Sequence, residues 1–224
     1  IALAMAVLFS GCAKQTEQVA EPTPIEETET TPTEAPDKKA KYVFLFVGDG
    51  MGVAQRNAAE LYLAGTVGKD ARPEDTRLLM NTLPAQGMNT TYDLKSVIPD
   101  SASTGTALAT GHKTWSGVVG MDADGKVTYE NISEVAKKNG WRVGVVSSVS
   151  IDHATPACFY AHEPARGNYY EIDETLVTSD FDYFAGGPLK RPTGPDGDNP
   201  TADLYAKAEE NGFVVARGRD ELMA

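Results

Sequence analysis

The strongest constraint on the fold is a helical pattern followed by Asn-Gly and an apolar run, which occurs twice in the chain. Residues 130–148 read ENISEVAKKNGWRVGVVSS, and residues 202–218 read ADLYAKAEENGFVVARG. In each segment a left-handed glycine is expected to end the helix and lead into a strand, from Trp141 to Val146 in the first and from Phe213 in the second. This alternation predicts an α/β fold with a largely parallel central sheet and helices on both faces.

An aspartate between two glycines follows the first apolar run of the domain, in KYVFLFVGDGMGVAQ at 41–55. Residues 42–47 have the composition of a strand buried on both faces, and helical spacing begins at Val53. Asp49 therefore falls at the edge of the sheet where α/β proteins bind ligands. A dinucleotide site is disfavoured, because Val53 replaces the third glycine and a carboxylate would repel pyrophosphate. Asp49 either holds a metal ion or caps a turn or helix.

A serine surrounded by small residues begins a second candidate segment, IPDSASTGTALATGHKT at 98–114. The pattern predicts a short helix that begins at Asp100 or Ser101 and is closed by Gly111. A helix N-terminus would stabilise a developing alkoxide on Ser101, and the small neighbours leave room for a tetrahedral group. The plain alternative is that Asp100 or Ser101 only caps the helix.

A third segment, SSVSIDHATPACFYAHEPARGNYY, places oxygen and nitrogen donors after another strand. His153 and Thr155 lie at the strand end, and Thr155 is also a natural cap for a helix that begins at Pro156. Arg166 follows this helix and offers either a bidentate clamp for phosphate or a surface ion pair. Because each follows a strand or begins a helix, we expect Thr155, Asp49 and Ser101 to converge at one edge of the sheet.

Three segments together, VFLFVGDGMG, PDSASTGTALATGHKT and DHATPACFYAHEPAR, resemble the alkaline phosphatase family in their order and separation. The resemblance covers residues 41 to about 215 and implies that 41–224 is the N-terminal half of that family's catalytic domain. It implies metal-dependent hydrolysis of phosphate monoesters through a phosphoserine intermediate. In PDSAS, Ser101 matches the nucleophile and Asp100 the residue that helps to orient the phosphate-binding arginine. In HEPAR, Arg166 matches that arginine.

The resemblance also implies two Zn²⁺ ions and one Mg²⁺ ion. Asp49 matches the carboxylate that bridges one zinc and the magnesium, Thr155 matches a magnesium ligand, and His153 lies close to the magnesium through its water shell. The family completes its zinc sites with histidines and acidic residues from the second half of the domain. The histidines here are His112, His153 and His162, and none lies in a matching zinc-ligand motif. We therefore expect residues 1–224 alone to be inactive.

The N-terminal part of the chain differs in composition from the rest. Residues 1–12 resemble the end of a bacterial signal peptide with a lipoprotein box, LFSGC, in which Cys12 would be lipidated; an ordinary signal peptide is the alternative. Residues 13–40 are acidic and rich in Pro and Thr, which predicts a disordered linker. With Cys12 in the anchor, Cys158 has no disulfide partner and is expected to pack in the core.

The formal net charge of −12 argues against a nucleic-acid partner. The leading hypothesis is an exported phosphomonoesterase, periplasmic or at the cell surface, which acts on small phosphorylated substrates and meets the membrane through a lipid anchor. A homodimer is one expected assembly. A related phosphodiesterase or sulfatase is one alternative. A non-catalytic surface lipoprotein that uses the fold for binding is another.

Overall fold

The computed structural model describes residues 40–194 and 203–224. The chain divides into two compact units, residues 1–46 and 47–224, and the elements named here belong to the second. The predicted signal peptide and all but the last residue of the predicted linker lie outside the described residues. Within the described part of the chain, no helix has the length and apolar character needed to cross a membrane.

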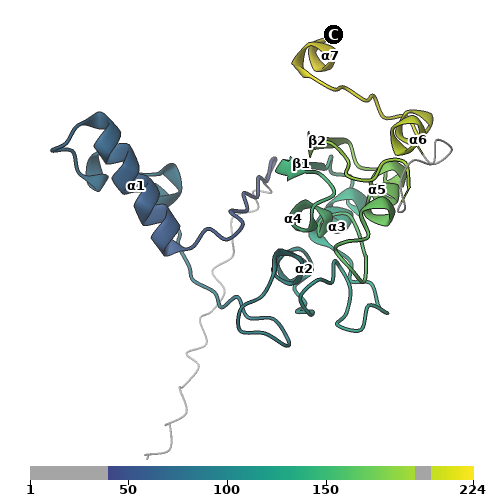
Figure 1. The fold of residues 1–224 in the computed structure, drawn as a ribbon, viewed down its shortest axis with the longest axis horizontal. Helices are drawn as coiled ribbons and strands as arrows, with labels where there is room; N and C mark the ends of the chain where they lie inside the picture. The colour runs from purple at the N-terminus through teal and green to yellow at the C-terminus, as the bar shows by residue number, and fades with distance from the viewer. Residues whose placement is uncertain (1–39, 195–202) are drawn as a thin grey trace, which may run out of the picture. The chain divides into compact units, whose positions relative to one another are not determined.

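A parallel strand pair confirms the predicted α/β class. β1 (Gly144–Ser150) pairs with β2 (Tyr183–Gly187), from Gly144 opposite Tyr183 to Ser150 opposite Gly187, with an irregularity between Val146 and Ser150 (Figure 1). Parallel neighbours require a crossover connection, and this one contains α4 (Ala154–Ala157) and α5 (Tyr169–Thr178). The residues that follow β1 therefore lead directly into the segment that carries the candidate site.

The helices begin and end largely where the sequence predicts. Asp100 caps α2 (Ser101–Thr110), and left-handed Gly111, at φ 76°, ends it. Asn131 and Glu134 form a capping box at the start of α3 (Ile132–Lys138). The prediction that a left-handed glycine ends each of the two helices with an Asn-Gly pair is confirmed, because Gly140 and Gly212 have φ of 79° and 93°.

The remaining helices complete the element order. α1 spans Val53–Val67, and short 3₁₀ turns follow at Pro73–Asp75 and Leu79–Thr82. Near the end of the chain, α6 spans Leu204–Glu210 and α7 spans Arg219–Met223.

A core of small and medium apolar residues joins α2 to α4 and α5 to α6. Its fully buried members include Ala102 of α2, Ala157 and Cys158 at α4, Ile172 of α5 and Leu204 of α6. Because small side chains line the contact between α2 and α4, the two helices approach closely. This packing sets the separation between the start of α2 and the first turn of α4.

Two strand predictions are wrong. Residues 42–47 form no strand, and their large apolar side chains are exposed, with Phe46 at 90%. The run after Phe213 also forms none, and Val214 is 92% exposed. An apolar run reports a tendency to be buried, whereas a strand needs a hydrogen-bonding neighbour, which neither run has among the described residues. The strand predicted from Trp141 to Val146 is instead β1, which begins at Gly144.

The predicted start of the helix after β1 is also wrong. α4 begins at Ala154 with His153 as its N-cap residue, so that Pro156 is the third helical residue rather than the first. Proline is tolerated there because the N–H groups of the first turn have no partner within the helix. Thr155 is free of the capping role, and its hydroxyl donates to Asp49.

Candidate active site

Ser101 lies at the N-terminus of a capped helix. A carboxylate oxygen of Asp100 accepts from the Ser103 N–H at 3.0 Å, and the Asp100 carbonyl accepts from the Thr104 hydroxyl at 2.8 Å. Ala102 and Ser103 are buried, whereas Ser101 itself is half-buried. The serine hydroxyl is therefore accessible at the positive end of the α2 dipole.

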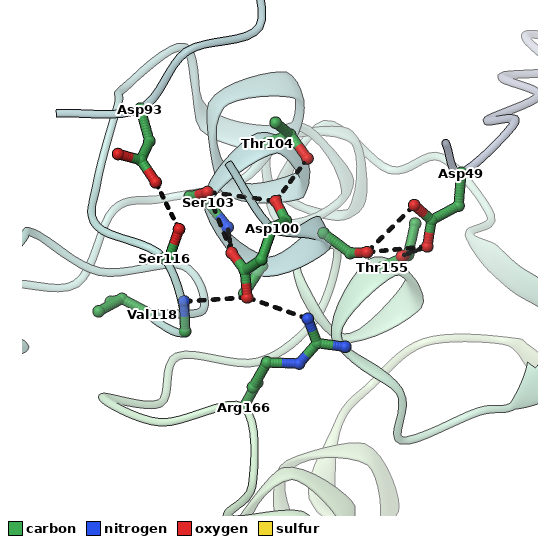
Figure 2. A network of polar contacts seen from close by, with 12 residues as sticks. Asp49, Asp93, Asp100, Ser103, Thr104, Ser116, Val118, Thr155 and Arg166 are labelled. Atoms are coloured by element: carbon green, nitrogen blue, oxygen red, sulfur yellow. Dashed lines mark hydrogen bonds and ion pairs between the residues drawn. The ribbon is translucent and has the colours of Figure 1, made fainter. Parts of the chain in front are cut away.

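One carboxylate brings three distant segments together. Ser101 Oγ donates to Asp49, at 2.9 Å from Oδ2 and 3.1 Å from Oδ1, and Thr155 Oγ1 donates to Asp49 Oδ2 at 3.0 Å (Figure 2). Gly50 has φ 65°, a left-handed conformation that suits glycine and turns the chain directly after Asp49. The expected convergence of Asp49, Ser101 and Thr155 is thus present in the structure.

The arginine beside the serine helix is held by an ion pair and by its own backbone. Arg166 Nη1 donates to Asp100 Oδ2 at 2.9 Å, and the Arg166 N–H donates to the Gly117 carbonyl at 2.7 Å. Burial alone would raise the pKa of Asp100, but hydrogen bonds from Ser103, Arg166 and Gly117 hold that pKa below its usual value. Asp100 therefore stays ionised and orients the guanidinium, whose side chain remains 30% exposed.

His153 lies next to this site and is held neutral. Burial lowers its pKa, and the positive charges of Arg166 and Lys190 lower it further, against the opposing charges of Asp49 and Asp152. Its Nδ1 atom is buried and has no hydrogen-bond partner among the described residues. A neutral imidazole with a free nitrogen is suited to an ion or to that ion's water shell.

The donor set fits a hard cation at Asp49 and Thr155. Magnesium prefers oxygen ligands, and the Asp49 carboxylate and the Thr155 hydroxyl supply oxygens within 3.0 Å of each other. Zinc prefers nitrogen and sulfur as well as carboxylate ligands, and a catalytic zinc takes three from the protein. Among residues 40–194 and 203–224, no three His, Cys, Asp or Glu side chains form such a group.

The other two histidines make contacts away from Asp49. His112 stacks on Tyr129 with ring centroids 4.4 Å apart. The ring nitrogens of His162 lie 2.9 Å from the Gly120 carbonyl and 2.9 Å from a Glu134 carboxylate oxygen.

Sequence reasoning missed a buried polar group that adjoins Asp100. Asp93 is 6% exposed and accepts from the Ser116 hydroxyl at 2.5 Å, and the Gly117 N–H donates to Asp100 Oδ2 at 3.0 Å. The only local signal was an aspartate before Leu-Lys-Ser, which is typical of a turn capped by its own side chain. The contact with residue 116 crosses 23 positions, so no local pattern indicates it.

A family model for alkaline phosphatase matches residues 40–184. The chain belongs to the alkaline phosphatase family. Alkaline phosphatase 4 of Drosophila melanogaster is 41% identical over 133 residues, which is 56% of this chain and 22% of the fly protein. Membership in the family supports phosphatase activity at that level. The chain spans about a quarter of the length of the curated animal relatives that it matches.

Solved alkaline phosphatases share the fold. The enzyme from Thermus thermophilus is 28% identical with a TM-score of 0.62, over 75% of this chain and 35% of that one. A mutant of the TAB5 alkaline phosphatase with Mg bound in its M3 site is 36% identical with a TM-score of 0.53, over 58% of this chain and 36% of that one. Both likenesses agree with the parallel α/β architecture of the described residues.

Proposed function

We propose that the protein hydrolyses phosphate monoesters in a metal-dependent reaction through a phosphoserine at Ser101. The observation that carries this proposal is the Ser101 hydroxyl at a helix N-terminus, 2.9 Å from the Asp49 carboxylate and beside an arginine held by Asp100. Family membership supports phosphatase chemistry in general, and the positions of Ser101 and Arg166 support their proposed roles as nucleophile and anion clamp.

The chain's own residues account for binding and for the first displacement. Arg166 binds two phosphate oxygens through its planar guanidinium, which Asp100 holds in orientation. The Ser101 hydroxyl directs its proton toward Asp49 and so keeps an Oγ lone pair free for the phosphorus. A bond forms between Ser101 Oγ and phosphorus while the bond from phosphorus to the ester oxygen breaks; the Ser101 proton passes along its hydrogen bond to Asp49, and the ester oxygen leaves as the alcohol with a proton from water. Water then attacks the phosphoserine, which releases phosphate and returns the proton to Ser101 Oγ.

The metal proposal rests on the same residues. Asp49 and Thr155 would hold one Mg²⁺ ion, with His153 near its water shell, and Asp49 would also contribute to one of two Zn²⁺ ions. When bound, the ions lower the pKa of the nucleophile and stabilise charge on the phosphate oxygens. The further zinc ligands are not among the side chains that the structure describes around Asp49.

The test compares variants of the metal-loaded, full-length protein on a phosphate monoester, a phosphate diester and a sulfate ester. Ser101→Ala should lower kcat for the monoester by about 10³-fold or more, because it removes the nucleophile. Arg166→Ala should lower kcat/KM by about 10²-fold, because it removes a preorganised charge. Ser133→Ala and Arg72→Ala, both far along the chain from the site residues, serve as matched controls and should keep full activity.

Peptide mapping after acid trapping should place the phosphate on the peptide that contains Ser101, and at Ser101 rather than Ser103. Label at Ser103, or full turnover by Ser101→Ala, would contradict the proposed nucleophile. Preferred turnover of the diester or the sulfate ester would favour a related hydrolase. No turnover of any ester by the metal-loaded protein would favour the non-catalytic binding role.

We also propose that the protein is exported and lipid-anchored through Cys12, because LFSGC resembles a lipoprotein box and precedes a polar, Pro- and Thr-rich segment. Mass spectrometry of the mature N-terminus should find a lipid on Cys12, and Cys12→Ala should release the protein from membranes. An unmodified Cys12, or cleavage well beyond it, would leave an ordinary secreted protein.

A further inference from the structure

Asp93 is a buried carboxylate outside the family-matched site residues, yet its contacts lead to Arg166. Its Oδ1 atom accepts from the N–H groups of Lys95 at 2.7 Å and Ser96 at 2.6 Å, and its Oδ2 atom accepts from Ser116 Oγ at 2.5 Å. The hydrogen bond from Ser116 lowers the pKa of Asp93 most, and the backbone hydrogen bonds act in the same direction against burial, to about 2. The carboxylate is therefore ionised at neutral pH.

Asp93 belongs to a contact between two loop segments, residues 92–96 and residues 113–117. Further contacts between them include Lys113 Nζ to the Tyr92 carbonyl at 2.6 Å, Leu94 N–H to the Thr114 carbonyl at 3.2 Å, and Lys95 Nζ over the Trp115 ring at 4.8 Å. The lysine contacts are largely exposed, whereas Asp93 is 6% exposed. Since hydrogen bonds to a buried charge contribute more free energy than exposed ones, Asp93 contributes most to the stability of this contact.

The second segment leads from this contact to the arginine. The peptide group between Ser116 and Gly117 carries the N–H that donates to Asp100 Oδ2 at 3.0 Å. The same oxygen accepts from Arg166 Nη1 at 2.9 Å, and the Gly117 carbonyl accepts from the Arg166 N–H at 2.7 Å. Fixing Ser116 therefore fixes both the carboxylate that orients the guanidinium and the backbone from which Arg166 projects.

Asp100 is also held from within the serine helix. The Ser103 hydroxyl donates to Asp100 Oδ1 at 3.0 Å. Ser103 is 2% exposed, so its hydroxyl has little access to water. Figure 2 shows the contact between Asp93 and Ser116 and, beside it, the contacts that join Asp100 to Ser103 and to Arg166.

We propose that Asp93 is a positioning residue for Arg166, which it holds in phosphate-binding orientation through Ser116, Gly117 and Asp100. This inference rests on the proposed function in one respect, that Arg166 binds the phosphate. The Asp100 and Arg166 side chains are 26% and 30% exposed, so their ion pair alone leaves the guanidinium free to reorient in water. A clamp for phosphate needs a defined orientation, and a misplacement of about 1 Å can cost on the order of 10²-fold in rate.

The experiment measures binding of inorganic phosphate to the metal-loaded, full-length protein by calorimetry. Asp93→Ala and Ser116→Ala should each raise the phosphate Kd by about tenfold, the size typical of losing a supporting hydrogen bond. The double variant should be no weaker than the worse single variant, because both changes break one connection. In an Arg166→Ala background, Asp93→Ala should change the Kd by less than about twofold.

Two further variants separate positioning from general stability. Asp93→Asn should restore most of the affinity, because its amide oxygen accepts from the loop N–H groups while its amide nitrogen donates to Ser116. Asp122→Ala is the matched control, because Asp122 also caps a turn, accepting from Lys126 and Val127, without a contact to the arginine. It should leave the phosphate Kd unchanged, and thermal unfolding of each variant shows that the protein is folded.

The proposal is overturned if Asp93→Ala weakens phosphate binding equally with and without Arg166, or if Asp93→Ala and Ser116→Ala lower only the Tm. Turnover measured in the same samples separates a failure of the positioning proposal from a failure of the proposed function. Phosphate binding with the expected coupling but no turnover would keep the positioning role and reject the proposed function. Normal turnover with no effect of Asp93→Ala on phosphate binding would keep the proposed function and reject the positioning role. A wild-type protein that binds no phosphate would reject both proposals.

Discussion

At the scale of single residues, the most unusual group is a second buried carboxyl, Asp173 on α5. It is fully buried, and neither carboxylate oxygen has a hydrogen-bond donor among the described residues. It lies near Asp152, which is also fully buried and accepts from the Lys190 N–H at 2.7 Å. Burial, and then the charge of Asp152, raise the pKa of Asp173 to about 9, so Asp173 is protonated at neutral pH.

This pKa predicts a loss of stability with rising pH. The pKa of Asp173 is about 9 in the folded state and near 3.8 when unfolded, so the folded protein binds the extra proton between these values. The free energy of unfolding should therefore fall as the pH rises from about 4 to about 9 and level off above that. Asp173→Asn keeps a neutral side chain of similar size and removes this titration. The variant should be more stable than wild type, by a margin that grows with pH.

Urea unfolding at pH 5, 7 and 9 measures this margin. Asp180→Asn, a change at an exposed aspartate two residues beyond α5, is the control and should follow the wild-type pH dependence. Parallel pH profiles for wild type and Asp173→Asn would show that Asp173 is not protonated in the folded state.

At the scale of elements, the contact between α2 and α4 fixes the distance between Ser101 and Thr155. Cys158 is fully buried here, donates to the Ala102 carbonyl at 3.3 Å, and fills the space beside Gly105. Burial raises the pKa of its thiol to about 12, so the thiol does not ionise at ordinary pH. The packing role expected for Cys158 from its apolar surroundings agrees with this environment.

Gly105→Ala should separate the two helices. A methyl group at Gly105 would lie 2.8 Å from Cys158 Sγ and 3.3 Å from Cys158 Cβ. Overpacking of this kind typically costs about 1–3 kcal/mol of unfolding free energy. Cys158→Ala vacates that space, so Gly105→Ala should be much less costly in the Cys158→Ala background.

Urea unfolding of both single variants and the double variant gives the coupling energy. Additive losses would show that the helices adjust independently of this contact. If the spacing of α2 and α4 sets the site, Gly105→Ala should also weaken phosphate binding, and the double variant should recover it.

At the scale of the whole molecule, the described residues contain one parallel strand pair and a core centred on α2, α4 and α5. The apolar run at 42–47 remains exposed. The chain covers 22% of the Drosophila relative and 35% of the Thermus thermophilus chain. A buried parallel strand requires a neighbour along its edge and helices across its faces. The run therefore has the composition of a buried strand, but residues 40–194 and 203–224 supply neither the neighbouring strand nor the covering helices that it would need.

The sequence by itself determined the fold class, the family, several helix ends and the candidate site residues. Helix ends at Gly111, Gly140 and Gly212 follow from local chemistry, because only the residues next to a helix end decide whether the chain can turn there. The same applies to Asp100 as a cap, whose partner is three residues away. Asp49, Ser101 and Thr155 are also candidates from local patterns, since each lies at a turn or helix start, although capping alone would explain the same residue types there.

Only the tertiary structure decided which distant groups meet. The Thr155 hydroxyl bonds Asp49 across 106 positions instead of capping α4, and Ser116 reaches Asp93 across 23. The pairing of β1 with β2 is also decided by long-range contacts. Such contacts depend on free-energy differences between whole packed arrangements. The neighbours of a residue in sequence do not indicate its long-range partner, because a carboxylate or hydroxyl can satisfy its hydrogen bonds locally or across the fold.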